Sequence, residues 1–135
     1  MITVKGVKIG TGRPKICVPI VEKRKESILK QAELVKEEQA ELVEWRADFF
    51  EQIEDEAVLL ETAEGLQDIL EDIPLLFTFR TAKEGGERQV SWKFYESLLK
   101  NISKSGFIDL VDVEMFRGYD ERLHQKKEWR VTDVC

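Results

Sequence analysis

The chain has 135 residues, of which 42% are hydrophobic and 36% charged, so it can form one globular domain with its own core. Its formal net charge of −6 and its lack of a basic stripe argue against a protein that binds nucleic acid. No apolar segment approaches the roughly 20 residues that cross a bilayer, and the first residues lack the apolar centre of a secretory signal. We therefore expect a cytoplasmic protein with no membrane or nucleic-acid partner.

Two short segments at the start of the chain alternate apolar and polar residues. They are residues 2–5 and 7–9, and Gly6 between them predicts a β-hairpin. The next apolar run, residues 16–21, is continuous, which is typical of a strand buried on both faces of a parallel sheet. Pro19 interrupts this run, and because proline cannot donate a hydrogen bond to a neighbouring strand, we expect it near a strand end.

Helices and strands alternate through the middle of the chain. Apolar residues at helical spacing predict three helices, at residues 25–38, 54–71 and 91–104. Apolar runs predict three more strands, at residues 42–47, 75–80 and 108–114. The order β-α-β-α-β-α-β indicates a parallel sheet with right-handed crossovers. Two architectures remain open from this pattern, a doubly wound open sheet and part of a (β/α)8 barrel.

Each predicted helix carries one apolar face, and these faces are the candidate core. Their members are Ile28, Ala32 and Val35, then Val58, Leu59, Ala63, Leu66, Ile69 and Leu70, and finally Phe94, Tyr95, Leu98 and Ile102. Gly106 follows the third helix, where a residue in the left-handed conformation is expected.

Polar side chains cluster toward the carboxyl end of three predicted strands. In each strand two polar residues are separated by one position and so share a face: Glu44 and Arg46, Thr78 and Arg80, Asp112 and Glu114. An unpaired buried charge costs several kcal/mol, so these groups must pair, reach solvent or bind a ligand. We favour a pocket for a small polar ligand at this edge of the sheet. The alternative is a buried network without a ligand, in which Arg46 bridges Asp112 or Glu114.

Other sites of known chemistry find no support in the sequence. There is no dinucleotide or phosphate-binding glycine motif and no HExxH motif. The two cysteines form neither a disulfide framework nor a CxxC spacing, and His124, the single histidine, has no nearby metal-ligand partners. We therefore predict no metal site, and we interpret Trp45, Phe77 and Phe79 as core residues rather than a platform for nucleic-acid bases.

Four segments together resemble the N-terminal half of type I 3-dehydroquinate dehydratase. They are Gly-Thr-Gly-Arg-Pro-Lys-Ile at 10–16, Val-Glu-Trp-Arg-Ala-Asp at 43–48, Leu-Phe-Thr-Phe-Arg-Thr at 76–81 with Lys-Glu-Gly-Gly at 83–86, and Asp-Leu-Val-Asp-Val-Glu at 109–114. The likeness runs from about Val4 to Phe116. It implies a (β/α)8 (TIM) barrel, here truncated to about four βα units with an N-terminal β-hairpin.

The resemblance also implies a reaction and its residues. The family is a lyase of the shikimate pathway, which leads to aromatic amino acids, and converts 3-dehydroquinate to 3-dehydroshikimate through a lysine Schiff base without a metal or redox cofactor. The protonated imine withdraws electrons, and a histidine transfers the protons. By motif, Glu44, Trp45, Arg46 and Arg80 bind substrate, and Glu84 orients the catalytic histidine. Pro19 stands where many relatives carry a serine that contacts substrate.

The resemblance ends before the catalytic residues. A full barrel needs about 250 residues, and the family's histidine and Schiff-base lysine belong to the fifth and sixth strands. His124 lacks the flanking His-Asp-Phe sequence of the family. We therefore divide the chain into residues 1–116, the N-terminal half of a barrel, and 117–135, a divergent tail. This predicts a substrate-binding part that lacks catalytic residues and uses its open barrel edges for self-association or for complementation by a separate C-terminal half. The alternative is a non-catalytic half-barrel that binds a small hydroxy-acid or complements a separate C-terminal half.

Overall fold

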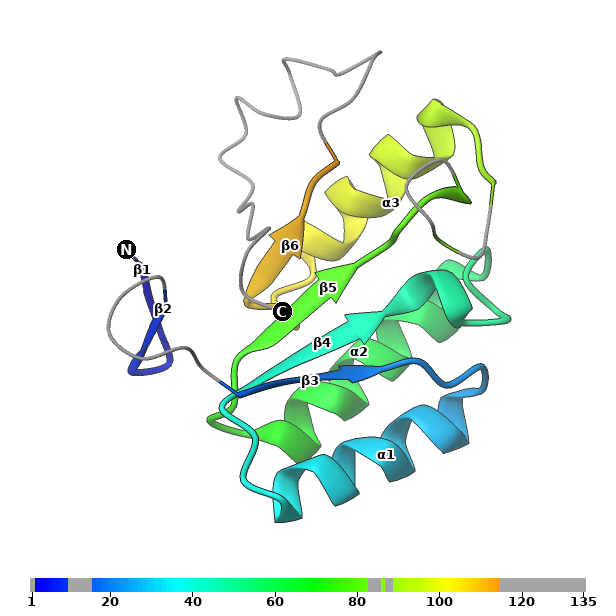
Figure 1. Cartoon of the computed structure of the whole chain (residues 1–135). Coiled ribbons are helices and arrows are strands. Elements are labelled where there is room, and N and C mark those ends of the chain that lie inside the picture. The colour runs from blue at the N-terminus through cyan, green and yellow to red at the C-terminus, as the bar shows by residue number, and fades with distance from the viewer. Residues whose placement is uncertain (1, 10–15, 83–85, 87–88, 115–135) are drawn as a thin grey trace.

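A four-stranded parallel sheet is the centre of the computed structural model, which describes residues 2–9, 16–82, 86 and 89–114. The strands are β3 (Cys17–Ile20), β4 (Leu42–Arg46), β5 (Leu75–Thr78) and β6 (Leu110–Asp112), in the order β3-β4-β5-β6 (Figure 1). Strands that follow one another in the chain therefore lie side by side in the sheet. The predicted parallel sheet is confirmed.

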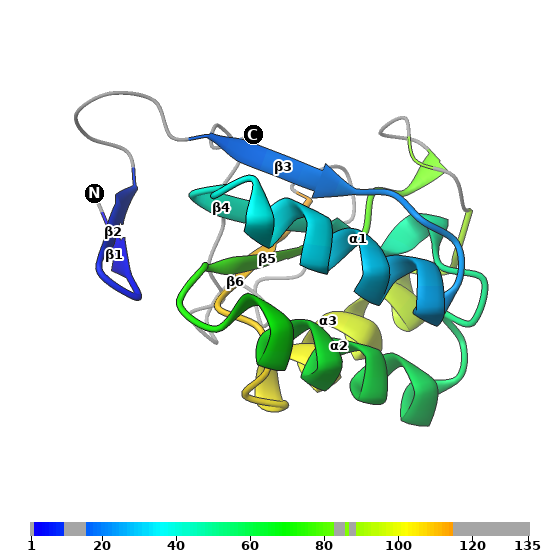
Figure 2. The same ribbon diagram turned by 90° about the horizontal axis from the view of Figure 1, so that it is seen from below.

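Three helices connect these strands and lie on one side of the sheet. They are α1 (Lys25–Glu37), α2 (Glu56–Leu70) and α3 (Trp92–Lys104), and a short 3-10 helix, η1 (Ala47–Phe49), follows β4. Figure 2 shows the three helices on the same side, next to the strands that they connect. Sequential strand order with all crossover helices on one side is the arrangement of a barrel, because a doubly wound sheet reverses its strand order and has helices on both faces.

The hydrophobic core fills the space between the helices and the sheet. Every second residue of a strand points to this side, and α1 contributes Ile28, Ala32 and Val35 as predicted. The other buried apolar members include Leu59, Ala63, Leu66 and Leu70 of α2 and Tyr95, Leu98, Leu99 and Ile102 of α3. Val58, Ile69 and Phe94 are only partly buried against this core, because they lie at the border of each apolar face.

The helices begin and end within two residues of the predicted limits, for reasons of capping. Asp55 precedes α2 and its side chain accepts a hydrogen bond from the Val58 amide at 3.2 Å. Ser91 has the same role before α3, accepting from the Phe94 amide at 3.1 Å. Gly106, just after α3, has a φ of 81°, so the predicted left-handed residue is confirmed.

The predicted N-terminal hairpin is present and closes the amino ends of the strands. Its strands β1 (Ile2–Val4) and β2 (Val7–Ile9) pair antiparallel, and the turn residues Lys5 and Gly6 both have positive φ. Val4 and Val7 pack against a small apolar cluster made by the first residues of the strands: Leu42, Leu76 and Leu110. The ammonium of Lys5 also lies 3.1 Å from the Asp109 carboxylate, just before β6.

Among the described residues, β3 and β6 each pair with one neighbour only. Pro19 lies opposite Glu44, one residue before the end of β3, as expected from its missing donor. Within the sheet of the described residues β3 is an edge strand, where proline is tolerated. In the part of the chain that the structure describes, none of the helices has the length and apolarity needed to span a membrane.

Candidate functional site

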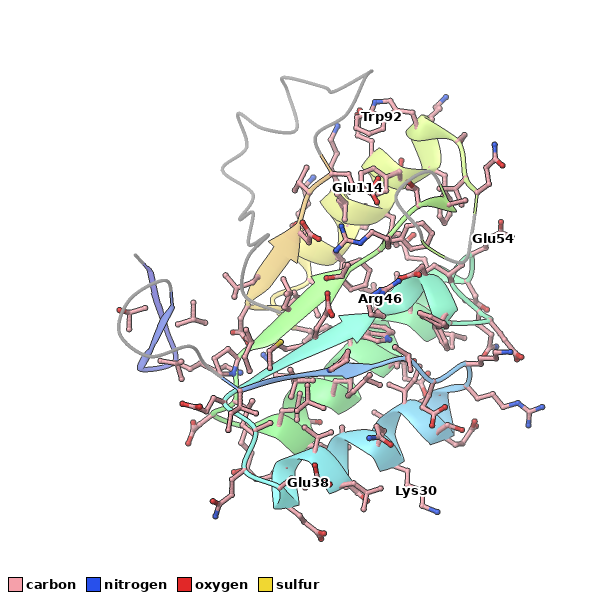
Figure 3. The ribbon with its side chains drawn as sticks, in the orientation of Figure 1. Lys30, Glu38, Arg46, Glu54, Trp92 and Glu114 are labelled. Carbon is pink, nitrogen blue, oxygen red and sulfur yellow. The ribbon has the colours of Figure 1, made fainter. Side chains whose placement is uncertain are left out.

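The face of the sheet that points away from the helices changes from apolar to polar along the strands. Toward the hairpin it carries the leucine cluster, with Glu44 opposite Leu76, and one row further along it carries Arg46, Thr78 and Asp112. Arg46 is opposite Thr78, and Thr78 is opposite Asp112, so these three share one row across three strands. Figure 3 shows Arg46 near the carboxyl ends of the strands, away from Lys30 and Glu38 at α1. The predicted polar residues of the strands thus come together.

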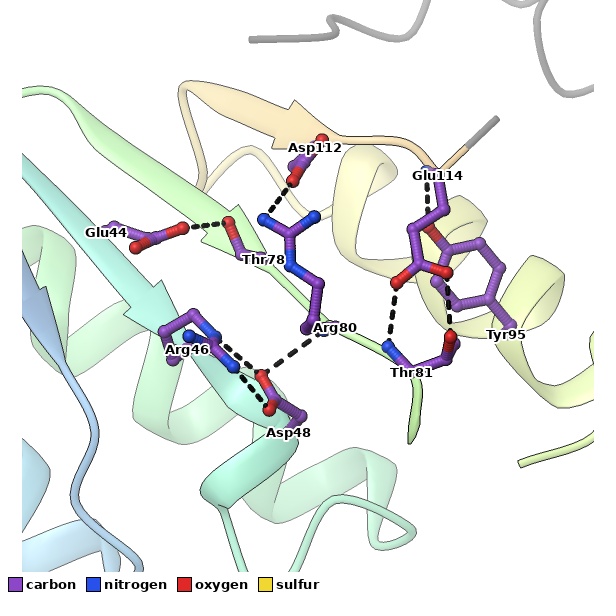
Figure 4. A network of polar contacts seen from close by, with 9 residues as sticks. All are labelled: Glu44, Arg46, Asp48, Thr78, Arg80, Thr81, Tyr95, Asp112 and Glu114. Carbon is purple, nitrogen blue, oxygen red and sulfur yellow. Dashed lines mark hydrogen bonds and ion pairs between the residues drawn. The ribbon is translucent and has the colours of Figure 1, made fainter. Parts of the chain in front are cut away.

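Arg46 is held by a carboxylate two residues further along the chain. Its Nε donates to Asp48 Oδ1 at 3.0 Å, and its Nη2 donates to Oδ2 at 2.9 Å, which makes a bidentate pair (Figure 4). Asp48 lies in η1 and is fully buried, while the Arg46 side chain keeps 21% of its surface exposed. The guanidinium carbon also lies 5.1 Å from the centre of the Phe49 ring, a cation–π contact. The orientation of Arg46 is therefore fixed before any ligand arrives.

Arg80 is fixed at both its backbone and its head group. Its Nη2 lies 3.0 Å from Asp112 Oδ2, and its backbone amide donates to Asp48 Oδ1 at 3.3 Å. Asp112 is almost fully buried, whereas 33% of the Arg80 side chain is exposed. Asp48 thus contacts both predicted substrate-binding arginines, which couples β4 to the residues that follow β5.

Glu44 is the third predicted substrate-binding residue on this face. It is buried, and its Oε2 accepts a hydrogen bond of 2.8 Å from the Thr78 hydroxyl. This contact joins neighbouring strands β4 and β5. Because Glu44 and Asp112 flank Thr78 on either side, the carboxyl end of the sheet presents carboxylate oxygens beside the two guanidinium groups. A site with both positive and negative charges suits a ligand with hydroxyl groups and an anionic group.

The carboxylate of Glu114 holds Thr81, the residue after Arg80. Its Oε1 accepts from the Thr81 amide at 2.7 Å, and its Oε2 accepts from the Thr81 hydroxyl at 2.9 Å. The Glu114 amide in turn donates to the Tyr95 hydroxyl at 2.9 Å. Burial raises the pKa of Tyr95 far above its ordinary value, outweighing the hydrogen bond from Glu114, which lowers it. Tyr95 is therefore neutral near neutral pH.

Trp45, the remaining predicted substrate-binding residue, lies on the opposite face. Its side chain is fully buried among the helices, with its ring 5.4 Å from Phe77 and 5.9 Å from Phe50. Strand alternation accounts for this, since residues 44 and 46 point to the polar face and residue 45 between them does not. We therefore do not carry Trp45 forward as a substrate contact. The interpretation of Trp45, Phe77 and Phe79 as core residues is confirmed by their burial.

The alternative from the sequence, a network of paired charges, is present with different pairs. Arg46 pairs with Asp48, and Arg80 pairs with Asp112, where the sequence pattern had suggested Arg46 with Asp112 or Glu114. Sequence reasoning missed Asp48 as a member of the cluster, although it ends the Glu-Trp-Arg-Ala-Asp motif. It also missed the roles of Thr81 and Tyr95. Glu84, His124 and the tail at 117–135 lie outside the described residues.

Two further features bear on what this region can bind. Among the residues that the structure describes, no group of three histidine, cysteine, aspartate or glutamate side chains could hold a metal ion. A cavity of about 200 Å³ lies on the helix side, between the start of α2 and α3, with walls that include Ile53, Leu59 and Leu98. It does not coincide with the polar cluster.

Comparison with known proteins decides the family. The sequence profile described as type I 3-dehydroquinase matches residues 16–133. The chain belongs to this family. Its curated relatives include the 3-dehydroquinate dehydratase of Clostridioides difficile (strain 630), 48% identical over 136 residues, and that of Clostridium botulinum (strain Eklund 17B / Type B), 45% identical over 120 residues. These alignments cover 96% and 89% of this chain but 53% and 47% of the relatives.

Solved dehydratase structures have the same fold over the same part. A crystal structure of the type I 3-dehydroquinate dehydratase from Clostridium difficile, with covalently modified comenic acid, superposes with a TM-score of 0.87 at 45% identity. The enzyme from Geobacillus kaustophilus superposes with a TM-score of 0.83 at 43% identity. This chain covers 52% and 47% of those two chains, so it spans about half the length of its relatives. The predicted fold, about four βα units of the type I dehydroquinase barrel, is confirmed.

Proposed function

We propose that this chain supplies one wall of the substrate pocket of a cytoplasmic type I 3-dehydroquinate dehydratase, the lyase that forms 3-dehydroshikimate. One observation carries the proposal: Glu44, Arg46 and Arg80 converge on one polar face of the sheet in a chain of this family. The substrate is a ring with hydroxyl groups and a carboxylate. Arginine donors suit the carboxylate, and a buried glutamate suits a hydroxyl, because each pairing is a charge-assisted hydrogen bond.

The described residues bind and orient rather than transform the substrate. The pairs to Asp48 and Asp112 hold the two guanidinium groups in place, so little side-chain entropy remains to be lost on binding. Both arginine side chains remain partly exposed and can reach a ligand over this face. In the proposal, Glu84 orients the histidine that transfers protons, and the lysine forms the Schiff base. That histidine and lysine belong to the strands that follow this part of the barrel.

The proposal includes a partner for the sheet. Among the described residues β3 and β6 are edge strands, and Ile16 and Val21 at the two ends of β3 are exposed. Edges of this kind pair readily with another strand. We propose that they mediate self-association, or association with βα units that complete the barrel. Size-exclusion chromatography with light scattering is expected to show oligomers, and a stable monomer at micromolar concentration would contradict this.

Calorimetry with quinate tests the binding part of the proposal. Quinate has the ring hydroxyls and the carboxylate but no ketone, so binding is measured without imine formation. We expect the full chain to bind quinate, and Arg80→Met or Glu44→Gln to weaken binding at least tenfold, about 1.4 kcal/mol. Arg24→Met is the matched control, because Arg24 is a largely exposed arginine before α1. No binding, or equal losses for Arg80→Met and Arg24→Met, would refute the proposal.

Turnover separates the enzyme from a binding module. The full chain is mixed with 3-dehydroquinate, first alone and then with a fragment of the Clostridioides difficile relative that contains the rest of the barrel. We expect formation of 3-dehydroshikimate with the fragment, and loss of that activity when Arg80→Met is used. Quinate binding without turnover in either mixture would favour the non-catalytic half-barrel.

A further inference from the structure

Four hydrogen bonds and one close backbone contact converge on the Arg80–Thr81 segment, just after β5. We propose that Glu114, seated by Tyr95, is a positioning residue: it clamps Thr81 and so sets where the Arg80 guanidinium lies over the polar face. This rests on the proposed function, in which Arg80 contacts substrate. The groups involved lie on three elements that are far apart in the sequence, and Figure 4 shows them around Arg80.

The clamp holds every polar group of Thr81. The amide and hydroxyl donate to the two oxygens of Glu114 at 2.7 and 2.9 Å. The carbonyl accepts from the Gly86 amide at 2.8 Å. A Cβ atom at Gly86 would lie 1.7 Å from the Arg80 carbonyl oxygen, so this approach requires glycine. The peptide between residues 80 and 81 is therefore fixed in plane and direction.

Glu114 can act as a clamp because it is itself anchored in the core. Its amide donates to the hydroxyl of Tyr95, which is 1% exposed on α3. The Tyr95 ring lies 6.3 Å from the Phe79 ring and 5.4 Å from the Trp92 ring. An anchor in a close-packed core moves little, so the position of Glu114 is transmitted to Thr81.

Glu114 affects the position of Arg80 because Thr81, which Glu114 holds, is the next residue in the chain. The backbone of Arg80 is held by Asp48 on one side and, through Thr81, by Glu114 on the other. Its guanidinium is held by Asp112 at 3.0 Å. With the backbone released, the Arg80 side chain must change its conformation to keep the pair with Asp112, so the position of its guanidinium over the polar face is no longer fixed. A small misplacement of this kind weakens ligand binding more than it weakens the fold.

The test uses threonine variants of the full chain. Thr81→Val keeps the shape of the side chain but removes the hydroxyl and leaves an apolar group against Glu114, and Thr81→Ser restores the hydroxyl. Thr62→Val is the matched control, because Thr62 is a fully buried threonine in α2 whose hydroxyl bonds only within its helix, to the Val58 carbonyl at 2.7 Å. Two readouts are taken: the NMR signal of the Arg80 Nε–H group without ligand, and the dissociation constant for quinate.

We expect Thr81→Val to shift or broaden the Arg80 signal and to weaken quinate binding at least fivefold. Thr81→Ser restores both within twofold, and Thr62→Val lowers stability without changing either readout. An unchanged Arg80 signal and unchanged affinity in Thr81→Val would overturn the clamp and leave the proposed function standing. A changed Arg80 signal in a chain that does not bind quinate would support the clamp and refute the proposed function instead.

Discussion

The two faces of the sheet are built from opposite chemistry. Trp45 and Arg46 are neighbours in β4, but Trp45 lies in the aromatic core against the helices and Arg46 lies in a network of ion pairs. The helix side gains stability from apolar burial. The polar side gains little from its charges, because desolvation offsets their attraction. Under the proposed function, the polar face serves binding and the apolar face serves folding.

The largest effect is expected from removing the aromatic centre of the helix side. Trp45→Ala should lower the free energy of unfolding by about 4 kcal/mol, because the ring is fully buried between Phe50 and Phe77. Urea denaturation measures this loss, and quinate affinity of the folded fraction should not change. A stable Trp45→Ala variant that no longer binds quinate would show that this tryptophan contacts substrate after all.

A smaller loss of stability is expected from breaking an ion pair on the polar face, and here quinate binding is lost as well. Arg46→Met leaves the buried Asp48 carboxylate without its bidentate partner and should cost about 3 kcal/mol. Adding Asp48→Asn removes the unpaired charge and should recover at least half of the lost stability, but not quinate binding. Denaturation and calorimetry on both variants check this. If the double variant were no more stable than Arg46→Met, the buried charge would not be the cause.

Alkaline pH should reveal the contribution of Tyr95 to stability. Its ring packs against Phe79 in the core, and its hydroxyl accepts a hydrogen bond from the Glu114 amide. Burial raises the pKa of Tyr95 above its ordinary value of 10.0, so the unfolded chain loses the phenolic proton first. The contribution of Tyr95 to the free energy of unfolding is fully present below pH 10. It falls as the pH rises above 10, on the order of 1 kcal/mol per pH unit. Tyr95→Phe should lack this part of the decline in urea denaturation at pH 9 to 11. An equal decline in both proteins would contradict the assignment.

The smallest effect is expected at a helix start, away from both faces. Asp55→Ala removes the acceptor for the Val58 amide and should lower stability by about 1 kcal/mol, as N-cap losses do. Asp55→Asn, which keeps the acceptor, is the control, and thermal or urea unfolding measures both. Quinate binding is expected to be the same in all three proteins. A change in affinity would place α2 closer to the binding site than the structure does.

Much of the fold could be predicted from the sequence, because it depends on local pattern. The apolar spacing of Ile28, Ala32 and Val35 defined the face of α1, and Gly106 marked the end of α3. The convergence of Glu44 and Arg80 could be predicted too, because both lie at the carboxyl ends of parallel strands. Alternation along β4 should also have placed Trp45 on the other face.

The partners within the cluster could not be predicted in the same way. A sequence shows which residues can form ion pairs but not which carboxylate lies within 3 Å of which arginine. Asp48 was missed because it comes after the strand, in a 3-10 turn that folds it back onto Arg46. Thr81 and Tyr95 carry no charge at neutral pH, so no charge pattern marks them. The role of Glu84 and the boundary at residue 116 stay predictions.

In the proposed function, Arg46 and Arg80 both contact one ligand at the polar face. An NMR titration of the full chain with quinate, observing arginine Nε–H signals, tests it most directly. We predict that the signals of Arg46 and Arg80 shift with the same dissociation constant, while that of Arg24 stays in place. Binding of quinate that leaves both signals unmoved, or that moves them with different dissociation constants, would contradict the claim.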